Sequence, residues 1–128
     1  MVFESFAHVP VTEELLRHVW EGEEDPSQGG HRYGLGREGK TEFPPWWDLA
    51  MVQMSIESVL NLPQLVVHMG NDILLAREVG KVIVIVKLKR LGNRVKISTA
   101  FPDSGTGVVR TSRGLRKEIP LNNYRWEA

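Results

Sequence analysis

The chain has 128 residues, of which 41% are hydrophobic and 25% are charged, so we expect one compact folded domain over residues 1–128. It contains no cysteine, which excludes disulfides and thiolate chemistry, and it has no run of about 18 apolar residues, so no membrane-spanning helix is predicted. Sixteen Lys and Arg balance sixteen Asp and Glu, but residues 1–60 carry a balance of −7 and residues 61–128 one of +7. On charge alone, attraction between the two halves within the fold is favoured over nucleic-acid binding.

Two helices are predicted in the N-terminal half. Thr12 can cap the first, which has two acidic residues in its first turn and ends near Trp20. Asp48 can cap the second, over roughly residues 48–61, where apolar residues recur at helical spacing. Between the helices, residues 21–45 are rich in glycine and proline and are predicted as irregular. Loops of this length in compact domains are usually functional or disordered, and the aromatic residues of this one argue against disorder.

The C-terminal half is predicted to form an antiparallel sheet. Runs rich in apolar and β-branched residues, separated by glycine turns, indicate its strands. These runs cover residues 65–69, 72–79, 81–90 and 94–101. Gly92-Asn93 is a hairpin signal that pairs the last two runs, residues 103–114 are predicted as a Gly/Ser/Thr-rich loop, and residues 115–126 as a short edge strand. The predicted fold class is α+β, with N-terminal helices packed on an antiparallel β-sheet.

Two histidines flank the irregular loop: His18 at the end of the first helix and His31 after Gly29-Gly30. Histidine is the side chain whose ordinary pKa lies nearest neutrality, so a pair can act as base and acid. Cleavage of RNA by its own 2′-hydroxyl needs such a pair, together with a cation that stabilises the charge of the transition state. Lys40, in the same loop, can supply that cation.

Each of these three side chains also has a structural interpretation, as a helix-end cation, a loop residue and a solvated surface lysine respectively. His8 and His68 rank as nearly equal candidates, and metal binding with Glu21 or Asp25 stays open. From the residues alone, the chain holds a candidate two-histidine site and no more.

Other prominent side chains also have two interpretations. Trp46 and Trp47 are predicted as a core wedge between helix and sheet rather than as platforms for bases. Arg32, next to the second histidine, can grip a phosphate or pair with Glu42. Four basic residues of the predicted hairpin can form a solvated sheet face or a track for an RNA backbone. These four are Lys87, Lys89, Arg94 and Lys96.

Four sequence blocks together resemble the bacterial EndoU family of endoribonucleases. They are His18-Val19-Trp20-Glu21-Gly22-Glu23, Gly29-Gly30-His31-Arg32-Tyr33-Gly34-Leu35, Lys40-Thr41-Glu42-Phe43-Pro44 and Ser98-Thr99-Ala100-Phe101-Pro102. The blocks stand in the family's order and span residues 18–102. The combination of Gly-Gly-His-Arg with a nearby Lys-Thr-Glu-Phe-Pro is the most specific part of the resemblance.

The resemblance implies a fold of the EndoU or pancreatic-ribonuclease type and a His-His-Lys triad that cleaves RNA to leave a 2′,3′-cyclic phosphate. On this chain, His31 matches the general base for the 2′-OH and His18 the general acid for the 5′-oxygen. Lys40 is the best match for the charge stabiliser. The fallback lysines are Lys81, Lys87 and Lys89.

The resemblance also implies substrate contacts. Thr99, with its neighbour Ser98, matches a position that contacts the substrate base or phosphate, and Gly30 lets the backbone approach the scissile phosphate closely. Arg32 is a further candidate contact. The family usually has tyrosine where this chain has Phe101, whose ring can stack on a ribose or base but lacks the hydroxyl. The preference for uridine is therefore left open.

By the same resemblance, the domain is a toxin borne at the C-terminus of a secreted effector and delivered into the cytoplasm of a target cell. Its expected partners are an RNA substrate, with tRNA as the first candidate, and a cognate immunity protein, with no membrane contact. No cofactor is expected; some relatives require manganese, but no metal site is evident in the sequence. The alternatives are a non-catalytic RNA-binding module, which Phe101 favours, and a metal-dependent hydrolase built on His18, His31 and nearby acids.

Overall fold

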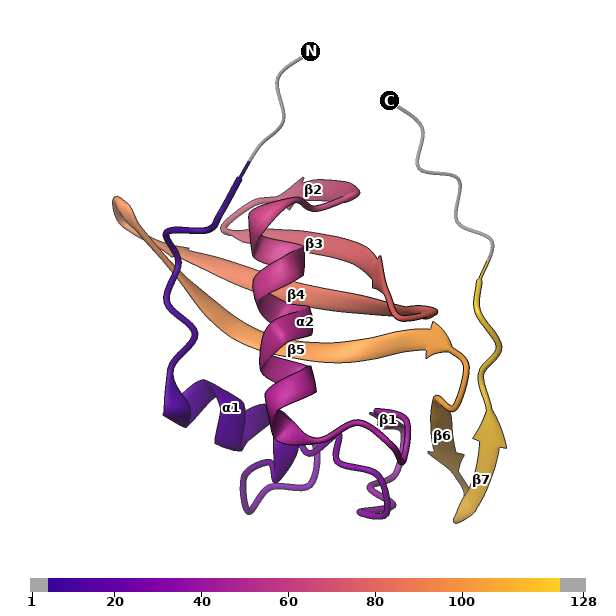
Figure 1. Cartoon of the computed structure of the whole chain (residues 1–128). Coiled ribbons are helices and arrows are strands. Elements are labelled where there is room, and N and C mark those ends of the chain that lie inside the picture. Colours follow the sequence, from indigo (N-terminus) through magenta and orange to yellow (C-terminus); the bar gives the residue numbers. More distant parts are fainter. Residues whose placement is uncertain (1–4, 123–128) are drawn as a thin grey trace.

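The computed structural model describes residues 5–122, which form an α+β arrangement of two helices and two antiparallel sheets (Figure 1). Helix α1 (Glu13–Trp20) begins at Thr12, whose hydroxyl accepts the N–H of Leu15 at 3.1 Å. Helix α2 (Leu49–Asn61) begins at Asp48, whose carboxylate accepts the N–H of Met51 at 2.8 Å. Both predicted helices and both predicted caps are confirmed, because capping is a local property of the sequence.

The larger sheet has the strand order β2-β3-β4-β5, and the smaller sheet has the order β1-β6-β7. The larger sheet consists of β2 (Leu65–Met69), β3 (Asp72–Val79), β4 (Val82–Leu91) and β5 (Arg94–Gly105). The smaller sheet consists of β1 (Thr41–Glu42), β6 (Val109–Ser112) and β7 (Leu115–Glu118). The predicted hairpin at Gly92-Asn93 is confirmed, since it joins β4 to β5.

The core lies between α2 and one face of the larger sheet. Figure 1 shows α2 crossing this sheet, and its contacts are with β3 and β4, while α1 packs against β5. Along β4, alternate residues from Val82 to Leu88 are buried in this core, so the intervening side chains, Lys87 among them, point to the other face. Neither helix in this part of the chain is long and apolar enough to cross a membrane.

The prediction of a single sheet followed by a loop at residues 103–114 is wrong. β5 continues to Gly105, which pairs with Val82, and Val109–Ser112 forms β6 between β1 and β7. The Gly/Ser/Thr composition favours a loop locally, but pairing with strands distant in the sequence overrides it. Similarly, Thr41–Glu42 of the predicted irregular segment forms β1. The predicted edge strand is confirmed at Leu115–Glu118, and residues 123–126 of that prediction lie outside the described part of the chain.

A β-bulge interrupts the pairing of β4 with β5. Lys87 pairs with Thr99 and Leu88 pairs with Ile97, which leaves Ser98 as the extra residue. The hydroxyl of Ser98 donates a hydrogen bond to the carbonyl of Lys87 at 3.1 Å. Bulges re-aim neighbouring side chains, and this one stands next to Thr99, the residue expected to contact a substrate.

The two adjacent tryptophans have different environments. Trp47 is 6% exposed and stacks on the fully buried Phe43 with 5.6 Å between ring centroids. Trp46 is 59% exposed and its ring lies against Gly107. The core role predicted for Trp47 is therefore confirmed, and the same prediction for Trp46 is wrong because the chain turns its ring outward.

We predict that Trp47→Ala lowers the free energy of unfolding by about 3–5 kcal/mol, because it leaves a cavity beside Phe43. Trp46→Ala is the matched control and is expected to cost about 1 kcal/mol or less. Urea unfolding followed by circular dichroism measures both. Equal losses for the two variants would contradict the assignment of Trp47 to the core.

Candidate active site

The end of α1 and the loop segment 30–32 are joined by three backbone hydrogen bonds. The N–H groups of Gly30, His31 and Arg32 donate in turn to the last carbonyls of the helix. Their acceptors are His18 at 3.0 Å, Val19 at 2.7 Å and Trp20 at 3.1 Å. These bonds satisfy carbonyls that a helix end otherwise leaves unpaired. They also fix the backbones of the two candidate histidines side by side.

Strand β5 holds both histidine rings. His18 Nε2 lies 3.2 Å from the hydroxyl oxygen of Thr99, and the ring of His31 stacks on Phe101 with a centroid distance of 5.7 Å. Thr99 and Phe101 are two residues apart on one strand, so they share a face of the sheet. The structure thus brings together four of the residues singled out in the sequence.

The ring of His18 is oriented from its other side by Glu23. The carboxylate of Glu23 lies 3.1 Å from His18 Nδ1, and a carboxylate at this position accepts the Nδ1–H. Nε2 is then the nitrogen that faces Thr99 and the interior of the site. The carboxylate–histidine pairing fixes both the tautomer and the direction of the ring.

His31 is held as a neutral imidazole. It is 4% exposed, and its Nδ1 donates a hydrogen bond to the carbonyl of Thr41 at 2.7 Å. Burial lowers the pKa of His31 to about 4, aided by the charges of Lys40, His18 and Arg37 and opposed by the bond to Thr41. Among residues 5–122, no hydrogen bond reaches its Nε2. At neutral pH this nitrogen therefore offers a lone pair, as a general base requires.

A cavity of about 250 Å³ opens beside His31. Its lining includes His31, Lys40, Lys87, Thr99, Phe101 and Arg110. All charged side chains of this lining are cationic, so the cavity favours an anion such as a phosphodiester. Lys87 lies on β4 with its Nζ 5.6 Å from the centre of the Phe101 ring, while Lys40 comes from the loop.

The predicted lysines separate into two groups. Lys40 and the fallback Lys87 line this cavity, whereas the fallbacks Lys81 and Lys89 do not. Arg110 lies on β6, and the sequence pattern does not identify it because residues 103–114 are predicted as a loop. Its strand pairing with Thr41 brings it to the cavity, and no local sequence signal indicates that pairing.

Arg37 orders the first part of the long loop. Its guanidinium donates hydrogen bonds to three backbone carbonyls, at 2.6 Å to Glu23 and 3.2 Å each to Asp25 and Gln28. Its side chain also lies against Gly30, where an added Cβ would be 2.7 Å from the arginine stem. Arg37 thus positions the residue that orients His18, a role that sequence reasoning missed.

Glu42 orders the second part of the loop. This carboxylate is fully buried and accepts the N–H groups of Gly34 at 3.0 Å and Gly36 at 2.7 Å. It also pairs with Arg116 of β7 at 3.3 Å. The predicted pairing of Arg32 with Glu42 is therefore wrong, because Arg32 Nε lies 3.2 Å from Glu21 instead.

Gly29 makes room for His18. With φ at 71°, a Cβ on this residue would stand 2.2 Å from the His18 carbonyl oxygen and 3.0 Å from its ring. The need for glycine here follows from packing against the candidate acid itself. The expected close approach of Gly30 to a phosphate remains a prediction.

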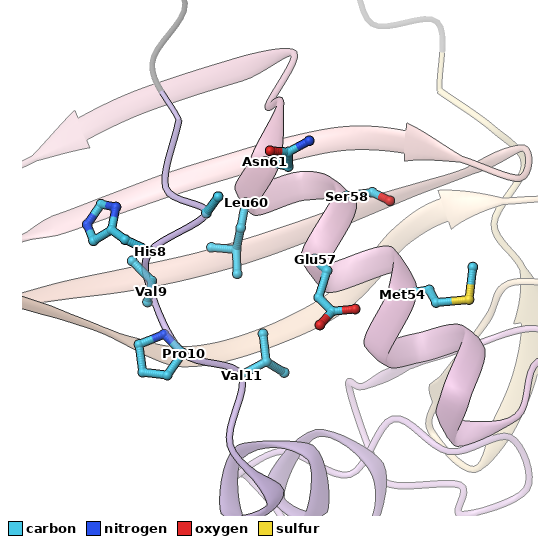
Figure 2. A pocket seen from close by; sticks show the side chains of 10 residues that line it. His8, Val9, Pro10, Val11, Met54, Glu57, Ser58, Leu60 and Asn61 are labelled. Atoms are coloured by element: carbon cyan, nitrogen blue, oxygen red, sulfur yellow. The ribbon is translucent and has the colours of Figure 1, made fainter.

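The other candidate histidines lie elsewhere. His8 lines a hollow of about 620 Å³ between the segment 7–11 and α2, and Figure 2 shows His8 on that segment and Glu57 on α2. His68 lies on β2, at the far edge of the sheet from β5, with its Nδ1 3.3 Å from Arg90. Within residues 5–122, no three His, Asp or Glu side chains gather in a way that could hold a metal ion.

Comparisons of the chain with protein-family profiles, with curated proteins and with solved structures find no match. The site is therefore described by its own geometry. It consists of two histidines in different environments, beside a cavity whose charged side chains are positive.

We predict that Gly29→Ala destabilises the protein by at least about 2 kcal/mol more than Gly114→Ala. Both glycines have φ between 71° and 75°, so both variants carry left-handed strain of about 1–2 kcal/mol, but only Gly29 would clash. At Gly114, no atom lies within 4 Å of the added Cβ. Urea unfolding gives the difference. Equal costs would mean that His18 does not pack against Gly29 as described.

We also predict a pH signature of the buried histidine. Its pKa is about 4 in the folded protein and about 6.5 in the unfolded chain, so between these values the unfolded state binds more protons. The His31 contribution to stability is present above pH 6.5 and falls by about 3 kcal/mol as the pH drops to 4. Unfolding of the wild type and of His31→Gln across this range isolates it. Parallel stability curves for the two proteins would contradict burial of a neutral His31.

Proposed function

We propose that this chain is an endoribonuclease of the EndoU type, with His18, His31 and a lysine of the cationic cavity as its catalytic residues. The observation that carries the proposal is that two different histidines contact the same strand. The buried, neutral His31 stacks on Phe101, and His18, which Glu23 orients, contacts Thr99. The α+β arrangement with antiparallel sheets is compatible with the EndoU or pancreatic-ribonuclease type of fold.

In the proposed reaction, Nε2 of His31 takes the proton of a ribose 2′-hydroxyl, and the 2′-oxygen attacks the adjacent phosphorus. His18, in its protonated form, delivers a proton from Nε2 to the departing 5′-oxygen. The products are a 2′,3′-cyclic phosphate and a free 5′-hydroxyl. The ring environments support this division of roles, because His31 is held without a proton on Nε2 and His18 has its Nδ1 bound to Glu23.

The negative charge of the transition state falls beside the cationic cavity. Lys40 is the proposed charge stabiliser, and Lys87 and Arg110 add to the positive potential of the same lining. Phe101 supplies an apolar wall on which a ribose or base can stack. Thr99, held at 3.2 Å from His18, is placed to donate its hydroxyl to a phosphate oxygen.

The proposed biological role follows the resemblance seen in the sequence. We infer a toxin domain, delivered by a secreted effector, that cuts tRNA or other RNA in the cytoplasm of a target cell. A cognate immunity protein would then block the cavity, and its fit to Lys40, Lys87 and Arg110 would call for an acidic surface. The competing function is a non-catalytic RNA-binding module, which the missing hydroxyl at Phe101 favours.

We predict that the purified protein cleaves total tRNA in EDTA and leaves 2′,3′-cyclic phosphate ends. His18→Ala and His31→Ala are each expected to slow cleavage at least ~100-fold, since each removes one proton-transfer group. Gel analysis with end-group determination measures both. His68→Ala is the matched control, because it lies three strands away, and full activity is expected.

Lys40→Ala and Lys87→Ala are compared in the same assay, and the larger loss identifies the main charge stabiliser. Retained RNA binding without cleavage by the folded wild type, with and without added manganese, would overturn the nuclease proposal in favour of the binding module.

A further inference from the structure

A second cavity is lined by His18. It has a volume of about 440 Å³, within the range of roughly 300–1,000 Å³ that is usual for small-molecule sites. His18 and Ser98 line it, whereas Thr99, which contacts His18 and follows Ser98 in β5, lines the cationic cavity. His18 therefore connects the two cavities, because its ring lines the second one and lies 3.2 Å from Thr99 of the first.

The chemistry of this second cavity is opposite to that of the first. Its apolar lining includes the buried side chains of Leu15 and Ile97. Its polar lining adds the carboxylates of Glu14 and Glu23 and the amide of Gln28. Carboxylates repel a phosphate but accept N–H groups, so the cavity suits a flat, uncharged ring with N–H donors on its edge.

We propose that this cavity holds the base of the downstream nucleotide, the one that carries the departing 5′-oxygen, and that it selects bases with an exocyclic amino group. The proposal rests on the proposed function, because it takes His18 as the group that protonates the departing oxygen. The nucleotide attached to that oxygen lies on the His18 side of the cut. The cavity that His18 itself lines is where its base fits.

Two features hold the acceptors in place before any substrate binds. Glu14 and His18 are four residues apart on α1, so both lie on the same helix face. The wall that carries Glu23 and Gln28 is fixed by Arg37, which binds the backbone carbonyls of both. Lys96, which also lines this cavity, offers a contact for the phosphate that follows this nucleotide in the RNA. A carboxylate aligned in this way discriminates by its hydrogen bond rather than by shape.

The test uses DNA oligonucleotides with a single ribonucleotide, which allow one cut only. The base after the ribonucleotide is varied in pairs that differ by the amino group: adenine and purine, guanine and hypoxanthine, cytosine and 2-pyrimidinone. We expect kcat/KM to be at least ~10-fold higher for the amino-bearing member of each pair, as for a hydrogen bond to a charged acceptor. Glu14→Ala is expected to bring these ratios close to one.

Glu13→Ala is the matched control, because Glu13 also stands in the first turn of α1 but does not line the cavity, and the ratios should not change. Cleavage of both members of each pair at equal rates, or ratios that persist in Glu14→Ala, would overturn this inference and leave the nuclease standing. No cleavage of any oligonucleotide by the folded wild type would overturn the proposed function itself, and this inference with it.

Discussion

The site depends on the hydrogen bonds between the end of α1 and the loop segment 30–32. Without them the last carbonyls of a short helix would lack partners, and His18 and His31 would belong to separate parts of the chain. With them, the positions of the last helix carbonyls determine where the backbone of His31 lies. The loop is irregular in conformation, but backbone hydrogen bonds tie this part of it to the helix.

The charge asymmetry of the sequence corresponds to different positions of the acidic and basic side chains in the structure. Acidic residues of the first half act inside the protein: Glu23 orients His18, and Glu42 binds two loop N–H groups and Arg116. Basic residues of the second half, such as Lys87 and Arg110, gather where a substrate would lie. Attraction between the halves, which charge alone favoured, is realised in the Arg116–Glu42 pair, whereas Lys87 and Arg110 line the cavity.

Local signals predicted the helices, their caps, the hairpin at Gly92-Asn93 and the class of the fold, because each of these depends on neighbouring residues. The smaller sheet was not predictable in this way, since β1 is two residues long and gains its identity only by pairing with β6. Arg110 was not identified for the same reason, since it reaches the site through that pairing. Arg37 and Glu42 were missed for a related reason: an arginine that binds carbonyls and a carboxylate that binds N–H groups look like surface charges until the loop closes around them.

In the proposed mechanism, the acid and base roles of the two histidines follow from their surroundings rather than from the residue type. The side chain of His18 is 18% exposed and has a carboxylate partner, whereas His31 is buried against Phe101 with a carbonyl as its acceptor. Burial lowers the pKa of His31, and a neutral imidazole suits the proposed role of general base. Phe101 contributes to this burial, because its apolar ring stacks on His31. In the proposed reaction, the missing hydroxyl at this position would leave both proton transfers intact and would weaken only the contact with a base.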